Sequence, residues 1–136
     1  MDKITDNLFV GDIRAAQNAE ILQRHCITHI VTIGKDLSPM FPQLYNYFCL
    51  PLVEETTECI GKHFNSFCKF VKSAIRRDSA NVLIHCMTGN NLSVCFAAAY
   101  LIKAFDYTLG TSLKIIKRAR PNLKPYSVFL SQLQSY

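Results

Sequence analysis

The stretch of sequence that decides the fold runs from residue 82 to residue 93 and reads VLIHCMTGNNLS. Its first three residues are apolar, as expected for a short strand that is buried on both faces of a parallel sheet. The glycine and the two asparagines further on indicate a tight loop. The apolar run that starts at Leu92 or Ser93 and ends at Phe105 predicts the next helix. We therefore expect a buried strand that passes through a tight loop into a helix.

Cys86 lies at the start of this loop, directly after the strand. Loop amides and a helix N-terminus that surround one point form a ready binding site for an anion. The same dipoles favour the thiolate form of a cysteine placed there. A thiolate beside a bound phosphate can act as a nucleophile toward phosphorus. The stretch therefore predicts a site that binds or cleaves phosphate groups.

The rest of the chain alternates between strand-like and helix-like segments. Strands are expected at residues 8–10, 27–33 and 45–50, and helices at residues 15–24, 60–77, 112–118 and 129–136. Asp12 is a candidate cap for the first of these helices. This alternation predicts an α/β fold: a single domain over residues 1–136 with a central, mostly parallel sheet that is flanked by helices on both faces. Residues 82–84 are expected to form its central strand.

Composition narrows the class of protein. The chain has 136 residues, 49% of them hydrophobic, which suits one domain with a buried core. Its longest apolar stretches are far shorter than the roughly 20 residues that span a bilayer. Its first residues lack the apolar core of a signal peptide. We therefore expect a soluble protein of the cytoplasm or nucleus that has no contact with a membrane.

Charge and cysteine spacing argue against several kinds of partner. The net charge of +5 comes without a long basic run, since only Arg76-Arg77 and the segment 114–124 are locally basic. This favours phosphorylated or acidic protein partners over nucleic acid. The six cysteines show neither a CxxC pair nor a ligand-like Cys/His spacing, so we expect free thiols, no metal site and no cofactor.

The residues around the cysteine resemble the signature of the cysteine-dependent protein phosphatases, His-Cys-x5-Arg-Ser/Thr. The residues in register are His85, Cys86, Gly89 and Ser93. The helix after the loop and residues 106–121 also fall in register with this family. The similarity covers nearly the whole chain, and the segments that resemble the atypical dual-specificity branch are residues 8–11, 27–30 and 129–133.

This resemblance implies a protein tyrosine phosphatase-like fold and a set of site residues. Cys86 stands at the position of the nucleophile, and Ser93 at that of the hydroxyl that helps the thiolate leave. His85 corresponds to a structural residue that orients the loop. Asparagine tolerates left-handed turn conformations, so both asparagines of the loop are candidates for them. The phosphate-binding loop itself corresponds to Met87, Thr88, Gly89, Asn90 and Asn91.

One position inside the signature departs from the family pattern. In the family, an arginine grips two phosphate oxygens and stabilises the transition state, and its place is held here by Leu92. Leucine has neither a hydrogen-bond donor nor a charge. The loop contains no other Lys or Arg, although Asn91 can still donate a hydrogen bond.

The general acid is the second departure, because the family carries an aspartate on a loop upstream of the cysteine. Alignment on Pro51 and residues 60–64 places Glu54 there, whereas counting back from Cys86 favours Glu55. Glutamate can donate a proton, but its longer side chain changes the reach. A solvated loop acid without a catalytic role is the other interpretation of either residue.

Three interpretations of function follow from these residues. The missing arginine favours a pseudophosphatase, which binds phosphorylated or acidic proteins in a regulatory, signalling role and does not hydrolyse them. The retained cysteine, glycine and serine support the alternative, a slow but active phosphatase for phosphotyrosine, phosphoserine and phosphothreonine with a phosphocysteine intermediate at Cys86. A third interpretation is a structural role, such as a subunit interface that uses exposed aromatic residues like Tyr126.

Overall fold

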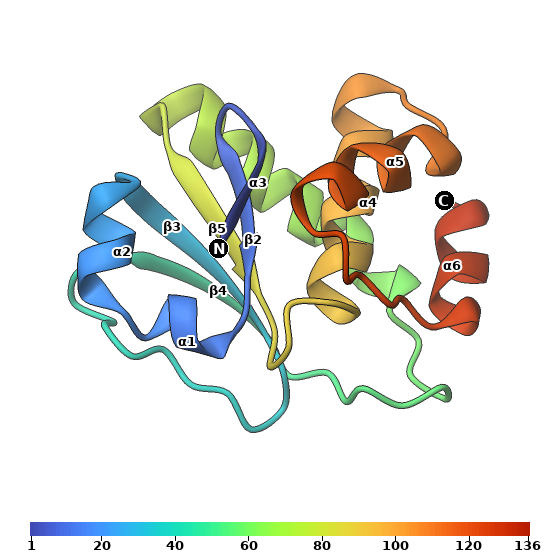
Figure 1. Cartoon of the computed structure of the whole chain (residues 1–136), viewed down its shortest axis with the longest axis horizontal. Coiled ribbons are helices and arrows are strands. Elements are labelled where there is room, and N and C mark those ends of the chain that lie inside the picture. The colour runs from blue at the N-terminus through green and yellow to red at the C-terminus, as the bar shows by residue number, and fades with distance from the viewer.

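The computed structural model describes all residues from 1 to 136, and a five-stranded sheet lies at its centre (Figure 1). The strand order is β1-β2-β5-β3-β4. Only β1 is antiparallel to its neighbour, and the other three pairs are parallel. The central position of the strand that precedes Cys86 is therefore confirmed. The strands are β1 (Asp2–Thr5), β2 (Leu8–Gly11), β3 (Ile27–Ile33), β4 (Asn46–Leu50) and β5 (Asn81–His85).

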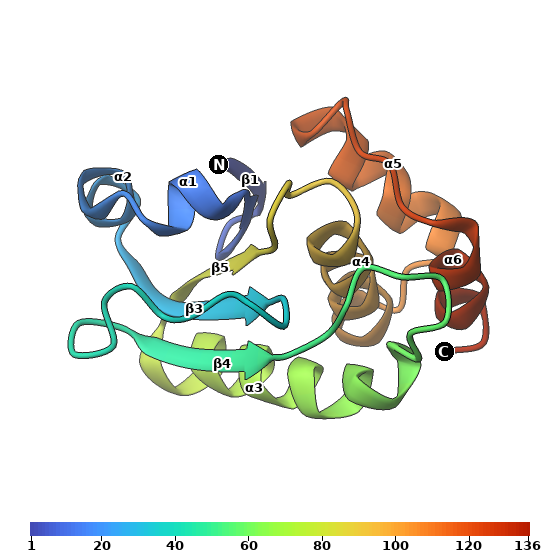
Figure 2. The same cartoon turned by 90° about the horizontal axis from the view of Figure 1, so that it is seen from below.

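Helices cover both faces of this sheet, as predicted (Figure 2). One face carries α1 (Ile13–Ala16) and α2 (Ala19–Arg24). The other face carries the longer helices, and α3 begins directly after a short 3₁₀ turn, η1. These elements are η1 (Gly61–His63), α3 (Phe64–Asp78), α4 (Leu92–Phe105), α5 (Leu109–Ala119) and α6 (Ser127–Gln134).

The alternating side chains of β5 join two hydrophobic cores. Val82 and Ile84 belong to the larger core under α3 and α4, whereas Leu83 belongs to the smaller core under α1 and α2. This alternation follows from the two-residue repeat of a strand. Burial on both faces explains why the strand is apolar throughout, and it holds the end of the strand at a defined place.

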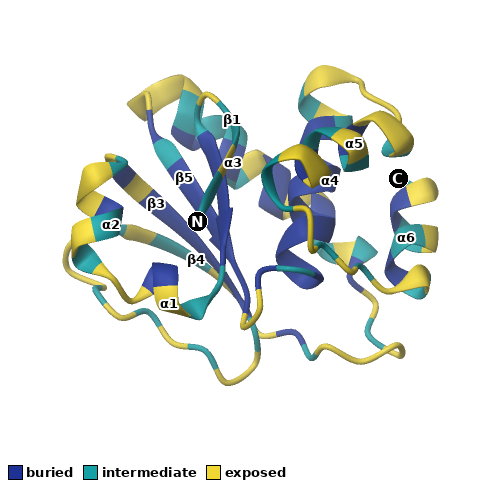
Figure 3. Ribbon diagram, viewed as in Figure 1, coloured by how far each residue is buried: buried dark blue, intermediate teal, exposed yellow.

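Helix α4 is the most deeply buried helix, and Figure 3 shows it as almost wholly buried along its first turns. All ten residues from Leu92 to Leu101 are buried, as expected for a helix that is apolar on every side. The ring of Phe96 lies edge-on against Phe64 and Phe67, with ring centroids 5.2 and 5.1 Å apart. Because α4 begins where the loop after β5 ends, this packing fixes the far end of the loop.

The segment 15–24, expected as one helix, is instead two short helices. Asp12 caps α1 as predicted, with its carboxylate accepting from the Ala15 amide at 3.0 Å. Asn18 starts a second helix by accepting from the Ile21 amide at 3.1 Å. A side chain that caps a helix start competes with a continuous helix at that point. The single-helix prediction was therefore wrong at Gln17 and Asn18.

Strand β1 is a further difference, because no strand was expected at residues 2–5. It is a short edge strand that pairs only with β2.

No helix of the chain is both long enough and apolar enough to cross a membrane. All six cysteines are free thiols, and no group of three or more His, Cys, Asp or Glu side chains is arranged to hold a metal ion.

Candidate active site

The loop between β5 and α4 lies at the end of the sheet where the parallel strands finish (Figure 2). Ligands of open α/β sheets bind at this edge. Backbone amides of neighbouring segments donate three of the hydrogen bonds that hold the loop in place. The Ile13 amide donates to the Met87 carbonyl at 3.2 Å, and the Lys124 amide donates to the Asn90 carbonyl at 2.7 Å. The third bond runs from the Tyr126 amide to Asn91 Oδ1 at 2.8 Å.

The loop curls around the sulfur of Cys86. Cys86 Sγ accepts from the Gly89 amide at 3.2 Å and from the Ser93 amide at 3.5 Å. The thiol also lies 3.2 Å from the Ser93 hydroxyl. A hydroxyl can rotate to donate instead of accept, so Ser93 can equally stabilise a thiolate. The structure thus brings together Cys86, Gly89 and Ser93, three of the residues that the sequence singled out.

Gly89 is the one loop residue whose backbone requires glycine. Its φ is 75°, and a Cβ built there would lie 2.7 Å from both the Gly11 carbonyl oxygen and Arg120 Nη2. Neither Asn90 nor Asn91 has a positive φ, so the left-handed conformation suggested for them was wrong. Their side-chain oxygens serve as hydrogen-bond acceptors for neighbouring segments instead. Glycine takes the left-handed position because a side chain cannot fit there.

Arg120, which the sequence did not single out as a site residue, braces the loop from outside. Its Nη1 donates to Asp2 Oδ2 at 2.7 Å. Its Nη2 donates to the Thr88 carbonyl at 3.4 Å and to Asn90 Oδ1 at 3.3 Å. The guanidinium is therefore engaged behind the loop and is absent from the lining of the pocket in front of Cys86. Only its position in the 106–121 segment marks it in the sequence.

A pocket of about 200 Å³ opens in front of Cys86. Seven of its eleven lining residues are hydrophobic, and one of them is Leu92, which is only 2% exposed. The charged residues that line it are Lys35, Asp36 and Glu54. Leu92, the residue that the signature alignment set at the arginine position, therefore contributes an apolar wall beside Cys86.

Of the two glutamates that sequence counting left open, Glu54 lines this pocket and Glu55 does not. The loop that carries Glu54 is closed by Glu58, whose Oε1 accepts from the Val53 amide at 2.8 Å. Among the five expected phosphate-loop residues, only Met87 lines the pocket with its neighbour Cys86. Lys35 and Asp36 belong to a segment that the sequence marked only as a loop.

Comparison with known sequences agrees with this geometry. The sequence model of the family described as the catalytic domain of dual specificity phosphatases matches residues 8–136. The chain belongs to this dual specificity phosphatase family. The match includes every strand except β1, together with the complete loop around Cys86.

Two relatives illustrate the distance within the family. Dual specificity protein phosphatase 1 of Arabidopsis thaliana is 32% identical over 131 residues, which are 96% of this chain and 66% of the relative. The Slingshot protein phosphatase homolog of Xenopus laevis is 29% identical over 129 residues, which are 95% of this chain and 18% of the relative. The chain thus spans less than two thirds of the length of each.

Solved structures of the family have the same fold. The human tyrosine phosphatase-like serine/threonine/tyrosine-interacting protein aligns with a TM-score of 0.94 at 27% identity, covering 100% of this chain and 94% of that one. Human DUSP28 aligns with a TM-score of 0.95 at 26% identity, again covering 100% and 94%. The predicted protein tyrosine phosphatase-like fold is confirmed.

His85 of this phosphatase domain is buried between β5 and β3. Its Nε2 lies 2.9 Å from the Thr32 hydroxyl, and its Nδ1 has no hydrogen-bond partner. Burial lowers the pKa of His85 from 6.5 to about 4, although the backbone of Cys86 and, to a smaller extent, the negative charge of Asp12 oppose this shift. The ring is therefore neutral at physiological pH. It lies outside the lining of the Cys86 pocket, which suits the structural role that the resemblance implied.

The cysteines of the phosphatase domain differ in their surroundings, which predicts different reactivity. We expect iodoacetamide to label Cys86 faster than Cys68 or Cys95 in the folded protein. Cys86 lines a pocket, and its sulfur accepts hydrogen bonds from two backbone amides, which stabilise a thiolate. In contrast, burial raises the pKa of the Cys68 thiol and raises that of the Cys95 thiol to about 12. Mass spectrometry of labelled peptides as a function of pH measures this. Equal rates for the three thiols in the folded protein would contradict the expectation, and equal rates in denaturant are the control.

Proposed function

We propose that this dual specificity phosphatase domain is catalytically impaired and binds phosphorylated or acidic proteins in a regulatory role. The observation that carries the proposal is the apolar wall that Leu92 contributes beside Cys86. The one cation that lines the pocket, Lys35, is accompanied by two acids, Asp36 and Glu54. The two carboxylates offset the charge of Lys35, so no side chain of the pocket can bind a phosphate as the guanidinium of an arginine would.

The size of the deficit follows from what such an arginine contributes. Removing one donor to a developing oxyanion costs about 2.7–4 kcal/mol, and a transition-state arginine in other phosphoryl-transfer enzymes is worth about 10³–10⁵-fold. The parts that remain are the loop amides and the N-terminus of α4, which attract an anion without holding it bidentately. Weak anion binding with little turnover is the combination expected from these parts.

The name of one structural relative supports a binding role. The human tyrosine phosphatase-like serine/threonine/tyrosine-interacting protein, which shares 27% identity over the whole of this chain, is named for interaction. Most side chains around the pocket are hydrophobic, so they suit an aromatic group such as the ring of phosphotyrosine. A phosphorylated protein segment therefore fits the pocket better than free phosphate does.

A slow phosphatase is the second candidate, favoured by the arrangement around Cys86. Its thiolate would form a sulfur–phosphorus bond while the bond from phosphorus to the leaving oxygen breaks. Glu54, which lines the same pocket, would give its proton to that oxygen. The oxygen of a water molecule would then bond to phosphorus while the sulfur–phosphorus bond breaks, and the ionised Glu54 would take the proton of that water. Ser93, 3.2 Å from the sulfur, would stabilise the departing thiolate.

An aryl phosphate assay beside a Cys86→Ser control separates the two candidates. We expect the natural chain to turn over no faster than Cys86→Ser, while calorimetry detects a phosphotyrosine peptide that binds more tightly than free phosphate. The unphosphorylated peptide is the matched control. Turnover that the natural chain shows and Cys86→Ser lacks would favour the slow phosphatase. Sub-micromolar binding of free phosphate would contradict the weakened anion site.

A further inference from the structure

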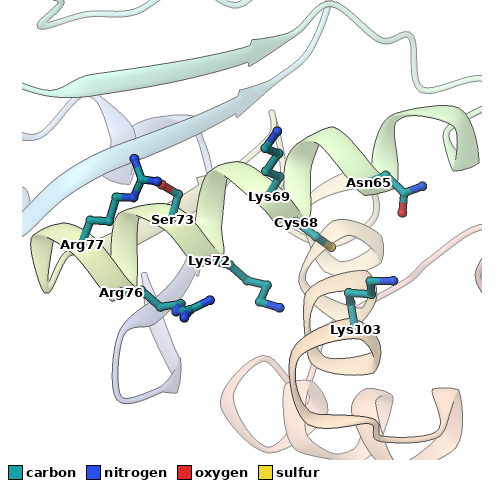
Figure 4. A pocket seen from close by; sticks show the side chains of 8 residues that line it. All are labelled: Asn65, Cys68, Lys69, Lys72, Ser73, Arg76, Arg77 and Lys103. Carbon is teal, nitrogen blue, oxygen red and sulfur yellow. The ribbon is translucent and has the colours of Figure 1, made fainter.

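The largest concave surface of the molecule lies away from Cys86. It is a hollow of about 700 Å³ along the outer side of α3, and none of its lining residues lines the Cys86 pocket (Figure 4). We call it the α3 groove. Its floor includes Cys68, and the side chains around it include Lys69, Lys72, Arg76, Arg77 and Lys103.

The spacing of residues along α3 produces the groove. The buried residues of this helix, among them Phe64, Phe67 and Val71, face the core. The other lining residues of α3 recur every three or four positions from Asn65 to Arg77, so they share the outward side of the helix. Cys68, which is buried, lies where this side meets the core. Twelve residues of helix rise about 18 Å, which makes the groove elongated. Lys103 of α4 closes one side of it (Figure 4).

Positive charge dominates the α3 groove. Five of the chain's fifteen Lys and Arg side chains line it, and no acidic residue does. None of these five takes part in a salt bridge. The Cys86 pocket differs, because it combines one cation with two acids. The excess positive charge of the chain is therefore concentrated at the groove and not at the expected phosphate site.

Helix stabilisation accounts for only part of this charge. Arg76 and Arg77 lie in the last turn of α3, where cations interact favourably with the helix dipole. Lys69 and Lys72 lie in the middle of the helix, and Lys103 comes from a different helix. The Lys103 ammonium has one local partner, the Tyr136 ring, whose centroid lies 6.0 Å away. Lys69 and Lys72 have no salt-bridge partner. All three line one hollow, and such a gathering of like charges points to an anionic occupant.

We propose that the α3 groove docks an extended acidic segment of a partner protein. The groove length of about 18 Å matches five or six residues of extended chain at roughly 3.3 Å each. Membrane binding is disfavoured because interfacial sites insert apolar side chains, and Cys68 is the only hydrophobic residue of the lining. Single-stranded nucleic acid is disfavoured because it stacks on aromatic rings, and no aromatic residue lines the groove.

This surface goes beyond the proposed function and does not depend on it, because the groove and the Cys86 pocket share no residue. A partner with an acidic segment would be held at the groove whether or not Cys86 performs chemistry. Since the contacts are between exposed charges, the interaction weakens as salt is added.

The test uses the full chain and a fluorescein-labelled hexaglutamate peptide, with hexaglutamine as the neutral control peptide. In fluorescence anisotropy at low salt, we expect hexaglutamate to bind and hexaglutamine not to bind. The groove variant Lys69→Glu/Arg76→Glu/Lys103→Glu should bind at least about tenfold more weakly. The matched variant Lys114→Glu/Lys117→Glu/Arg118→Glu makes the same charge change on exposed residues of α5 and should bind like the natural chain.

Substitution to glutamine at the same two sets of positions repeats the comparison without charge reversal, in case a reversed helix fails to fold. Equal losses from the groove set and the α5 set would overturn the proposal, since only net charge would then matter. Absence of hexaglutamate binding would overturn it as well. Binding to phosphatidylserine vesicles without binding to hexaglutamate would replace it with a membrane surface. Cys86→Ser should leave hexaglutamate binding unchanged, and a loss there would place the peptide at the Cys86 pocket instead.

Discussion

Leu92→Arg should raise the turnover of an aryl phosphate by about 10²–10³-fold. Leu92 is the first residue of α4 and lines the pocket beside Cys86. The sulfur already receives the Gly89 and Ser93 amides, so the loop geometry needed for attack is in place. An arginine at this position would supply the two parallel donors that the transferring phosphate lacks. The measurement is steady-state release of the aryl alcohol, with the same substitution in a Cys86→Ser chain as the blank.

A lysine at the same position is the matched control for this prediction. Lysine supplies a positive charge without the planar fork of arginine, so Leu92→Lys should recover only part of the gain. The apolar wall, which includes Leu52 and Val53, resists a charged group. A folded Leu92→Arg chain that binds phosphate tightly and still shows no turnover would place the defect elsewhere.

A second substitution, at the position of the general acid, tests the same account of catalysis. Adding Glu54→Asp to Leu92→Arg should help more with phosphotyrosine peptides than with an aryl phosphate, because an activated leaving group needs the proton least. Glu55→Asp should have no such effect, since Glu55 does not line the pocket. A larger gain from Glu55→Asp would instead indicate that Glu55 stands at the position of the general acid.

Acidification from about pH 6.5 to about pH 4 should remove roughly 3 kcal/mol of folding free energy through His85 alone. Burial lowers the pKa of His85 from 6.5 in the unfolded chain to about 4 in the folded one. Between these values the unfolded chain binds the proton more readily than the folded chain does. The contribution of His85 to the free energy of unfolding is therefore fully present above pH 6.5 and is lost as the pH drops toward 4. Below pH 4 both states are protonated and this loss no longer grows.

Urea unfolding at several pH values measures this effect, and a His85→Gln chain serves as the comparison. Glutamine keeps a polar group near the Thr32 hydroxyl, which lies 2.9 Å from the histidine ring, but it does not titrate. Carboxylates of the chain titrate in both proteins, so the difference between the two slopes isolates the histidine. Parallel slopes for the two chains would mean that His85 accepts a proton in the folded state without cost.

The sequence predicts the centre of this fold well because its signals are local. An apolar strand, a loop with glycine and a buried helix follow one another within residues 82–105, and each is visible without knowledge of any partner. The break between α1 and α2 was missed because it depends on which of two structures the Asn18 side chain stabilises. Strand β1 was missed because its four residues alternate weakly and gain their order from pairing with β2.

The same distinction, between local signals and contacts of distant segments, separates the predicted from the missed residues of the candidate site. Cys86, Gly89 and Ser93 are close in sequence, so one motif locates all three. The choice between Glu54 and Glu55 depended on the course of the loop after β4. The contribution of Arg120 depended on its contact with Asp2, which lies 118 residues away in the sequence. The α3 groove could not be predicted from the sequence of α3 alone, because Lys103 of a second helix also lines it. Contacts between distant segments leave no spacing signal in a single sequence.

Segments that are distant in the sequence supply the hydrogen bonds that tie the loop after β5 to the rest of the domain. The residues that supply them are Arg120, Ile13, Lys124 and Tyr126. None of these four lines the Cys86 pocket. The shape of the loop and the chemistry of its interior are therefore under separate control. Arginine and leucine could therefore replace one another at position 92 during evolution, in either direction, without unravelling the loop. Under the proposed function, this one exchange would be the evolutionary step between recognising a phosphate and removing it.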